Sequence, residues 1–165
     1  MPGVITELTG PLVIDRGRGI GYHGRTERLN DAGVRATHAA FDLRLSFVFD
    51  LVPAEYHTNV VMAVLAARAL VVHAASFADP EVPRAIARGY GGHAVWLGDE
   101  EKAAFAGNCI ALAADQVWMS AVAERSLAHA TRRAFGRAGF VIHTVELDEI
   151  EKAGGSLRCC IGEIF

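Results

Sequence analysis

The sequence predicts one mixed α/β domain over residues 1–165, made from a strand, strand, helix, strand unit that recurs three times. Three observations lead to this prediction. The length of 165 residues suits one domain. Hydrophobic residues make up 52% of the chain, which is enough for a core. Paired runs of β-forming residues alternate with helical stretches that end near glycine. One such unit cannot bury its own sheet, so we expect the units to pack around a common centre.

The predicted elements follow the same order in each unit. In the first unit, we expect strands at 12–15, 19–23 and 44–51 and a helix at about 31–41. In the second, we expect strands at 59–65, 69–74 and 93–98 and a helix that begins after Asp79 and Pro80. In the third, we expect strands at 109–114, 116–121 and 140–147 and one helix from about 123 to 138, ended by Gly139. A short helix within 98–107 joins the second unit to the third.

Composition and charge argue against several classes of protein. The net charge of −3 comes from well-mixed acidic and basic residues without a basic stripe, so no nucleic-acid partner is expected. The longest apolar stretch, residues 60–75, is interrupted by Arg68 and is too short to cross a bilayer, so no membrane association is expected. The first ten residues hold no cationic segment followed by an apolar one, so we expect no secretory signal. The three cysteines include an adjacent pair, which does not suit a disulfide framework and indicates a reduced, cytoplasmic protein.

The C-terminal segment GGSLRCC holds the clearest candidate for chemistry. Two glycines allow the backbone to turn sharply or to approach a ligand. Arg158 precedes Cys159, and a cation beside a thiol favours the reactive thiolate. A cysteine of this kind, paired in space with a distant histidine, is a candidate nucleophile. The alternative is that Cys159 and Cys160 are small buried core residues.

Two further segments could supply partners for a nucleophile. In EYHTNVV, His57 lies where a loop joins an apolar strand, a position that suits a general acid or base. In ELTGPLVID, Glu7 precedes a Thr-Gly turn and could orient a histidine or hold a cationic group. The alternatives are a surface histidine and a solvated carboxylate. The other histidines and Cys109 show no metal-ligand spacing, so we expect no zinc site. Covalent catalysis by a cysteine requires no metal or organic cofactor, so none is expected.

Taken together, these segments resemble one family. GGSLRC near the C-terminus, YHTNV in mid-chain, FAGN at 105–108 and E-x-T-G before LVID occur in that order in the arginine deiminase-related amidinohydrolases of the pentein superfamily. That group includes the citrulline hydrolases and the dimethylarginine dimethylaminohydrolases. The resemblance runs from Glu7 to Phe165. It implies a pentein-type α/β propeller of ββαβ units, of which this chain would hold about three of five blades and would lack the N-terminal two.

The resemblance also implies roles for named residues. The nucleophile would be Cys159, the catalytic histidine His57 and its acidic partner Glu7. The GRTERLN segment is similar to the family's S-x-R-T segment, so Arg25 would hold the substrate carboxylate. The chain departs from the family at Leu8, where glycine is usual, and at His23, where S-x-R-T has serine. Asn108 matches the motif, but no chemistry is assigned to it.

The expected function is a cysteine-dependent hydrolase acting on the guanidino or ureido carbon of an arginine-like or citrulline-like small molecule. Two alternatives stay open within the family: an amidinotransferase, and an inactive truncated pentein that serves as a binding or interaction module. An unrelated α/β domain is a third alternative. Because two blades would be absent, we expect self-association, or a second chain that completes the propeller.

Overall fold

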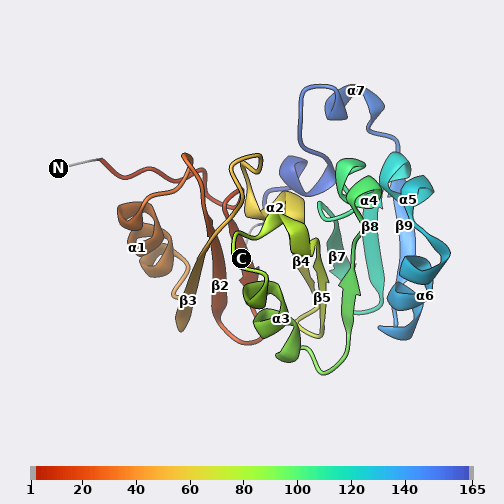
Figure 1. Ribbon diagram of the computed structural model, residues 1–165, viewed down its shortest axis with the longest axis horizontal. Coiled ribbons are helices and arrows are strands. Elements are labelled where there is room, and N and C mark those ends of the chain that lie inside the picture. The colour runs from red at the N-terminus through yellow and green to blue at the C-terminus, as the bar shows by residue number, and fades with distance from the viewer. Residues whose placement is uncertain (1–2, 164–165) are drawn as a thin grey trace.

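Three small sheets stand side by side along the molecule in the computed structural model, which describes residues 3–163 (Figure 1). Residues 1–2 and 164–165, at the ends of the predicted domain, lie outside this range. The sheets contain β1 (Leu12–Asp15), β2 (Ile20–Arg25) and β3 (Leu45–Asp50); β4 (Met62–Leu65), β5 (Ala69–Val72) and β6 (Ala94–Trp96); β7 (Ile110–Ala113), β8 (Gln116–Ser120) and β9 (Val141–Val145). In each sheet the middle strand pairs antiparallel with the first strand and parallel with the third. The predicted order of elements is therefore confirmed in all three units.

A helix makes the crossover that each parallel pair requires. These helices are α1 (Asp31–Ala40), α3 (Glu81–Arg88) and α6 (His129–Arg137). The shorter helices are α2 (Thr58–Val61), α4 (Asp99–Ala103), α5 (Ala121–Ser126) and α7 (Asp148–Glu151), with 3₁₀ turns η1 (Ala74–Ser76) and η2 (Leu157–Cys160). Asn30 begins α1 as an N-cap, because its side chain accepts a hydrogen bond from the Gly33 amide at 2.8 Å.

Two predicted elements are wrong in part. The strand expected at 59–65 begins only at Met62, because residues 58–61 form α2. The buried Thr58 hydroxyl accepts from the Gly24 amide at 2.9 Å and donates to the Pro11 carbonyl at 2.7 Å. These contacts fasten the segment to the first unit instead of to a strand ladder.

The single helix expected at 123–138 is broken into α5 and α6 at Leu127 and Ala128, which are extended. The Ala128 amide donates to the buried Glu101 carboxylate at 2.9 Å, so the freed backbone donor is satisfied. Glu101 also accepts from the Gly98 amide, which begins α4, at 2.7 Å.

The apolar cores lie between the units. One core joins the first and second units and contains Tyr22, Phe49 and Met62; the other joins the second and third and contains Leu65, Met119 and Phe135. Successive residues of β5 face the two cores in alternation, so the second sheet is buried on both faces. The units therefore depend on one another for burial, as the sequence indicates.

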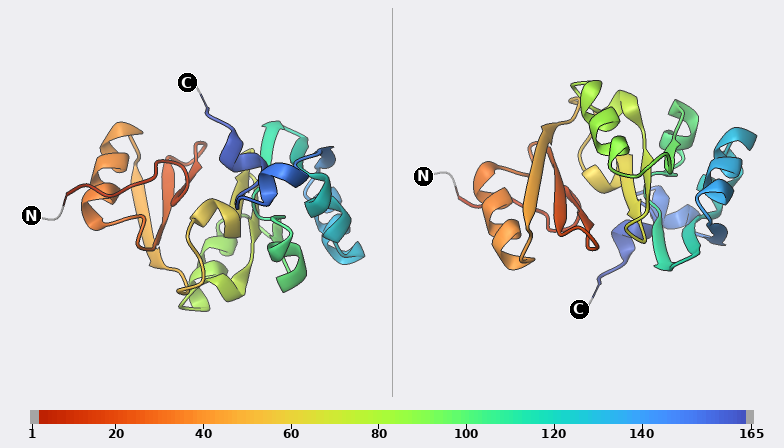
Figure 2. Two further views of the ribbon diagram at one scale, coloured as in Figure 1. Left: turned by 90° about the horizontal axis from the view of Figure 1, so that it is seen from above. Right: turned by 90° about the horizontal axis from the view of Figure 1, so that it is seen from below.

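The first strand of each sheet lies on the inner side of the assembly. β4 contacts both β1 and β7, and the chain end approaches these strands from one side (Figure 2). None of the helices in the described residues is long and apolar enough to cross a membrane.

Candidate active site

Three segments distant in the sequence converge at the beginning of the inner strands. Glu7 lies just before β1, His57 just before α2 and β4, and Cys159 within η2 after the third unit. The Glu7 carboxylate lies 2.6 Å from the His57 ring, between Oε2 and Nε2. The structure therefore brings together three of the four residues predicted from the sequence, through contacts described below.

Glu7 also accepts hydrogen bonds from Arg28. Arg28 Nη1 lies 3.0 Å and 3.1 Å from its two carboxylate oxygens. Desolvation opposes ionisation of Glu7, but the hydrogen bonds from His57 and Arg28 outweigh it and hold the pKa below its usual range. The carboxylate is therefore charged near neutral pH and can fix the orientation of the imidazole.

The backbone beside Glu7 accounts for the glycine of the Thr-Gly pair, Gly10, and for the conformation of Leu8. A Cβ on Gly10 would lie 2.6 Å from Cε1 and Nε2 of His57, so only glycine leaves room for the ring. Leu8 adopts a φ of 50°, in the left-handed region that glycine adopts readily. The chain thus keeps a turn of the glycine type although leucine occupies the position.

Cys159 lies where its sulfur reaches groups from two other segments. Asn108 Nδ2 is 3.2 Å from Sγ, and Asn59 Oδ1 is 3.6 Å from it. Partial desolvation opposes ionisation of this thiol, but interactions with the His57 side chain, the Ser156 backbone and Asn108 outweigh it. The pKa of Cys159 is therefore lowered from its ordinary value. A lowered pKa increases the fraction of thiolate, the nucleophilic form.

The three cysteines have different surroundings. Cys159 and Cys160 are exposed, so the alternative that both are buried core residues is wrong. Cys109 is buried, and burial raises its pKa to about 12, so it is unreactive. The expected help from Arg158 is not seen, since its guanidinium pairs with Glu163 at 2.8 Å and donates to the Ile161 carbonyl at 2.9 Å.

The glycine pair shapes the turn that carries the thiol. Gly154 and Gly155 have φ values of 88° and 79°, which side chains rarely adopt. A Cβ on Gly155 would also lie 3.2 Å from the Cys159 sulfur. The predicted role of these glycines in a sharp turn is confirmed.

Arg25 is not in contact with this cluster. Within the described part of the chain its exposed guanidinium pairs with Asp31 at 3.1 Å and Asp50 at 3.8 Å. Its role toward a substrate carboxylate stays a prediction, and would require the guanidinium to release at least one of these acids. Arg28, three residues later, was not assigned from the sequence, and only its place in the same GRTERLN segment hinted at a role.

A buried network supports the segment before His57. The Glu55 carboxylate receives Lys102 Nζ at 2.6 Å and the Ser76 hydroxyl at 2.8 Å, and Ser76 also contacts His73 Nδ1 at 2.7 Å. Glu55, Ser76 and His73 are all buried, so their mutual hydrogen bonds satisfy groups that water cannot reach. The backbone that leads into His57 is thereby anchored to the second unit.

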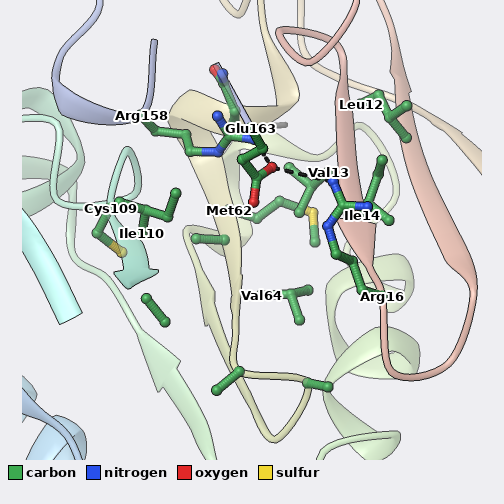
Figure 3. Close-up of a pocket in the computed structure, with 15 residues that line it drawn as sticks. Leu12, Val13, Ile14, Arg16, Met62, Val64, Cys109, Ile110, Arg158 and Glu163 are labelled. Carbon is green, nitrogen blue, oxygen red and sulfur yellow. Dashed lines mark hydrogen bonds and ion pairs between the residues drawn. The ribbon is translucent and has the colours of Figure 1, made fainter. Parts of the chain in front are cut away.

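A groove runs along the inner strands, and Asn59 and Arg158, from the segments that carry His57 and Cys159, are among the residues that line it. It encloses about 220 Å³ and is lined by residues of β1, β4 and β7, including Val13, Met62 and Ile110 (Figure 3). At its rim Glu163 lies between Arg158 and Arg16, 2.8 Å and 3.4 Å from their guanidinium groups. Among the described residues, no cluster of three or more His, Cys, Asp or Glu side chains could hold a metal ion.

Comparison with known proteins identifies the family and the fold. The family model described as "N,N dimethylarginine dimethylhydrolase, eukaryotic" matches residues 3–165. No curated protein sequence matches the chain. Among solved structures, the product-bound N-terminal domain of ArgZ, an arginine dihydrolase of Cyanobacteria, superposes with a TM-score of 0.81 at 20% identity. That match covers 96% of this chain and 56% of the other.

A dimethylarginine dimethylaminohydrolase bearing an S-methyl-L-thiocitrulline adduct gives a TM-score of 0.67 at 23% identity. It covers 91% of this chain and 53% of the other. At these identities the likeness shows the fold, and the chain spans about half the length of the structures that it matches. With the family match over nearly its whole length, the chain belongs to the eukaryotic N,N-dimethylarginine dimethylhydrolase family, within the pentein superfamily.

Proposed function

We propose that this chain carries the nucleophilic half of a cysteine-dependent hydrolase that acts on the guanidino or ureido carbon of an arginine-like or citrulline-like substrate. The observation that carries the proposal is the convergence of Cys159, His57 and Glu7: the Glu7 carboxylate lies 2.6 Å from the His57 ring, and the His57 side chain helps to lower the pKa of the Cys159 thiol. The names of the similar structures support the substrate class: one is an arginine dihydrolase, another a dimethylarginine dimethylaminohydrolase.

In the proposed reaction the Cys159 thiolate attacks the central carbon of the substrate, and a C–S bond forms. His57 gives its proton to the departing nitrogen, the C–N bond breaks, and ammonia or an amine leaves. The intermediate on the sulfur is an S-alkyl thiouronium when the substrate is a guanidine, and an S-alkyl thiocarbamate when the substrate is a urea. Water then attacks its carbon while His57 takes the proton, and cleavage of the C–S bond restores the thiolate. Glu7 stays ionised throughout and orients the imidazole.

We take residues 1–165 as one part of a pentein propeller that is completed by further polypeptide, which can be more of the same chain, a second copy or another protein. The reason is that the chain spans about half the length of its structural relatives. The substrate pocket then has walls that these residues do not provide. Release to water is preferred over transfer to an amine, because both similar structures are named as hydrolases.

Three substitutions test the assignment of the nucleophile. We expect Cys159→Ser and His57→Ala to abolish turnover of arginine, citrulline or dimethylarginine, measured as amine or ammonia release. Cys160→Ser is the matched control, because it makes the same change at the neighbouring exposed thiol and should leave turnover largely intact. Loss of turnover in Cys160→Ser alone would mean that the nucleophile is misassigned.

A covalent probe tests the site when turnover by this chain alone is too slow to measure. Chloroacetamidine carries an amidinium that resembles a guanidinium, and chloroacetamide is its neutral counterpart. We expect chloroacetamidine to label Cys159 in preference to Cys160, and the preference to vanish in His57→Ala. Equal labelling of both thiols by both reagents would favour the alternative of an inactive binding module.

A further inference from the structure

Asn108 occupies the point where the segments of the candidate site meet. It is completely buried and lies directly before Cys109 and β7. The backbone before it packs against α2, since a Cβ on Gly107 would lie 2.4 Å from the Val60 carbonyl oxygen. The side chain of Asn108 is therefore held at a fixed place between the second and third units.

The carboxamide of Asn108 uses both of its ends. Its oxygen accepts from the backbone amides of Ser156 and Cys159, at 3.1 Å and 3.3 Å. Its nitrogen donates to the Asn59 carbonyl at 2.8 Å and to the Cys159 sulfur at 3.2 Å. The backbone carbonyl of Asn108 accepts a further hydrogen bond, from the backbone amide of Arg158 at 3.2 Å.

These partners define which way the amide points. Two backbone N–H groups can be met only by the carbonyl end, and the Asn59 carbonyl only by the NH₂ end. The NH₂ group therefore faces the sulfur, to which it can donate but from which it cannot accept a proton. A donor of this kind favours a thiolate over a thiol.

We propose that Asn108 is a positioning residue of the reaction: it holds the Cys159 turn against the segment that carries His57, and donates the hydrogen bond that stabilises the thiolate. The inference rests on the proposed function in taking Cys159 as the nucleophile. Asn59 lies two residues after His57 along the chain. One amide group thus links the histidine segment and the cysteine turn.

Besides Asn108, Asn59 Oδ1 lies 3.6 Å from the sulfur, where it can accept a hydrogen bond from the thiol and so opposes the thiolate. The charged or titratable groups near the sulfur in the described part of the chain are the following. His57 approaches from the segment before α2, with Glu7 behind it. Tyr56, whose pKa is raised by burial and by the charge of Cys159, lies beside them. The amide of Asn108 does not titrate, so in the parent it adds no titration of its own to the pH profile of the thiol.

The test separates holding the turn from stabilising the thiolate. Asn108→Asp keeps the acceptor oxygens for Ser156 and Cys159 but removes the donor and adds a negative charge. Asn108→Ala removes both. Asn30→Asp is the matched control, because aspartate also serves as an N-cap of α1 and the change likewise removes an amide donor, here the one to the Gly3 carbonyl at 2.8 Å. All variants carry Cys160→Ser, so that Cys159 is the exposed thiol that remains.

The first measurement is the rate of iodoacetamide alkylation against pH, which gives the apparent pKa of Cys159 without any substrate. We expect Asn108→Asp and Asn108→Ala to raise it by about one pH unit or more, the effect of losing a hydrogen bond to a charged group. Asn30→Asp should leave it unchanged. The second measurement is amide hydrogen exchange, in which Ser156 and Cys159 should lose protection in Asn108→Ala and keep it in Asn108→Asp.

The outcomes distinguish this inference from the proposed function. A parent protein in which Cys159 titrates like an ordinary thiol contradicts the proposed nucleophile. A lowered pKa in the parent that persists in folded Asn108→Asp and Asn108→Ala overturns the role of Asn108 alone. Should Asn108→Asp fail to fold, Asn108→Ala decides the question, because it lacks the same donor.

Discussion

Replacing Gly10 by alanine tests whether the His57 ring must lie against the backbone before β1. The new Cβ would lie 2.6 Å from Cε1 and Nε2 of the ring and 2.8 Å from Nδ1. Carbon atoms in contact are normally about 3.5 Å or more apart, so the ring would have to move by about 1 Å. The backbone of Gly10 does not adopt a positive φ, so alanine adds no conformational strain there.

Because the atoms in the way belong to a side chain, the displacement should affect the site more than the fold. A shift of about 1 Å would break the 2.6 Å contact with Glu7 and misalign the imidazole with the sulfur. A misplacement of this size costs about a hundredfold in rate. We therefore expect Gly10→Ala to lose about that factor in turnover and in preferential labelling by chloroacetamidine, while its melting temperature stays close to the parent's.

Gly136→Ala is the matched control. It lies in α6, and a Cβ there meets nothing within 4 Å. It should keep full activity and gain about 0.5–1 kcal/mol of stability, because alanine is the better helix former. The steric argument fails if Gly10→Ala is as active as Gly136→Ala, since the ring would then have room that the structure does not allow.

Two further predictions concern charged groups. Lys102→Met should destabilise the fold by about 3 kcal/mol in urea unfolding, because it leaves the buried Glu55 carboxylate without its 2.6 Å partner. Adding Glu55→Gln should recover much of that loss, and a single-variant loss below about 1 kcal/mol would contradict the reasoning. Glu7→Gln should cost no more than about 1 kcal/mol at neutral pH, since the Glu7 side chain is 44% exposed. Folding lowers the pKa of Glu7. The stability difference between the parent and Glu7→Gln should therefore have its full size at pH values above the unfolded pKa, near 4.5, and should vanish as the pH falls through the folded pKa. A difference that grows on acidification would contradict it.

Much of the fold could be predicted because local signals and tertiary packing agree. Some signals depend only on residues close together in the chain. Examples are the paired β-forming runs that become β4 and β5, and the glycine that follows α6. The break between α5 and α6 could not be predicted, because the Ala128 amide is satisfied by Glu101 from a different helix. Likewise, α2 replaces the start of a strand through contacts with Pro11 and Gly24.

The candidate site also contains residues that could be predicted from the sequence and residues that could not. Cys159, His57 and Glu7 could be named from short motifs, whose glycines leave room for ring and sulfur. Arg28 and Asn108 could not be assigned, because their roles depend on which segments meet in space. The resemblance indicated Arg25 for a substrate carboxylate, and that role awaits a test with substrate bound.

The placement of the sulfur has a consequence for how folding can be followed. Cys159 lies in a turn near the end of the chain, and its amide and sulfur are held by Asn108, from the beginning of β7. His57 comes from the second unit and Glu7 from the strand start of the first. A fragment that lacked the second unit or the third would therefore lose His57 or Asn108, two of the groups that lower the pKa of this thiol. The rate of alkylation at Cys159, followed through denaturation by peptide mass in Cys160→Ser, therefore reports whether the second and third units are packed together.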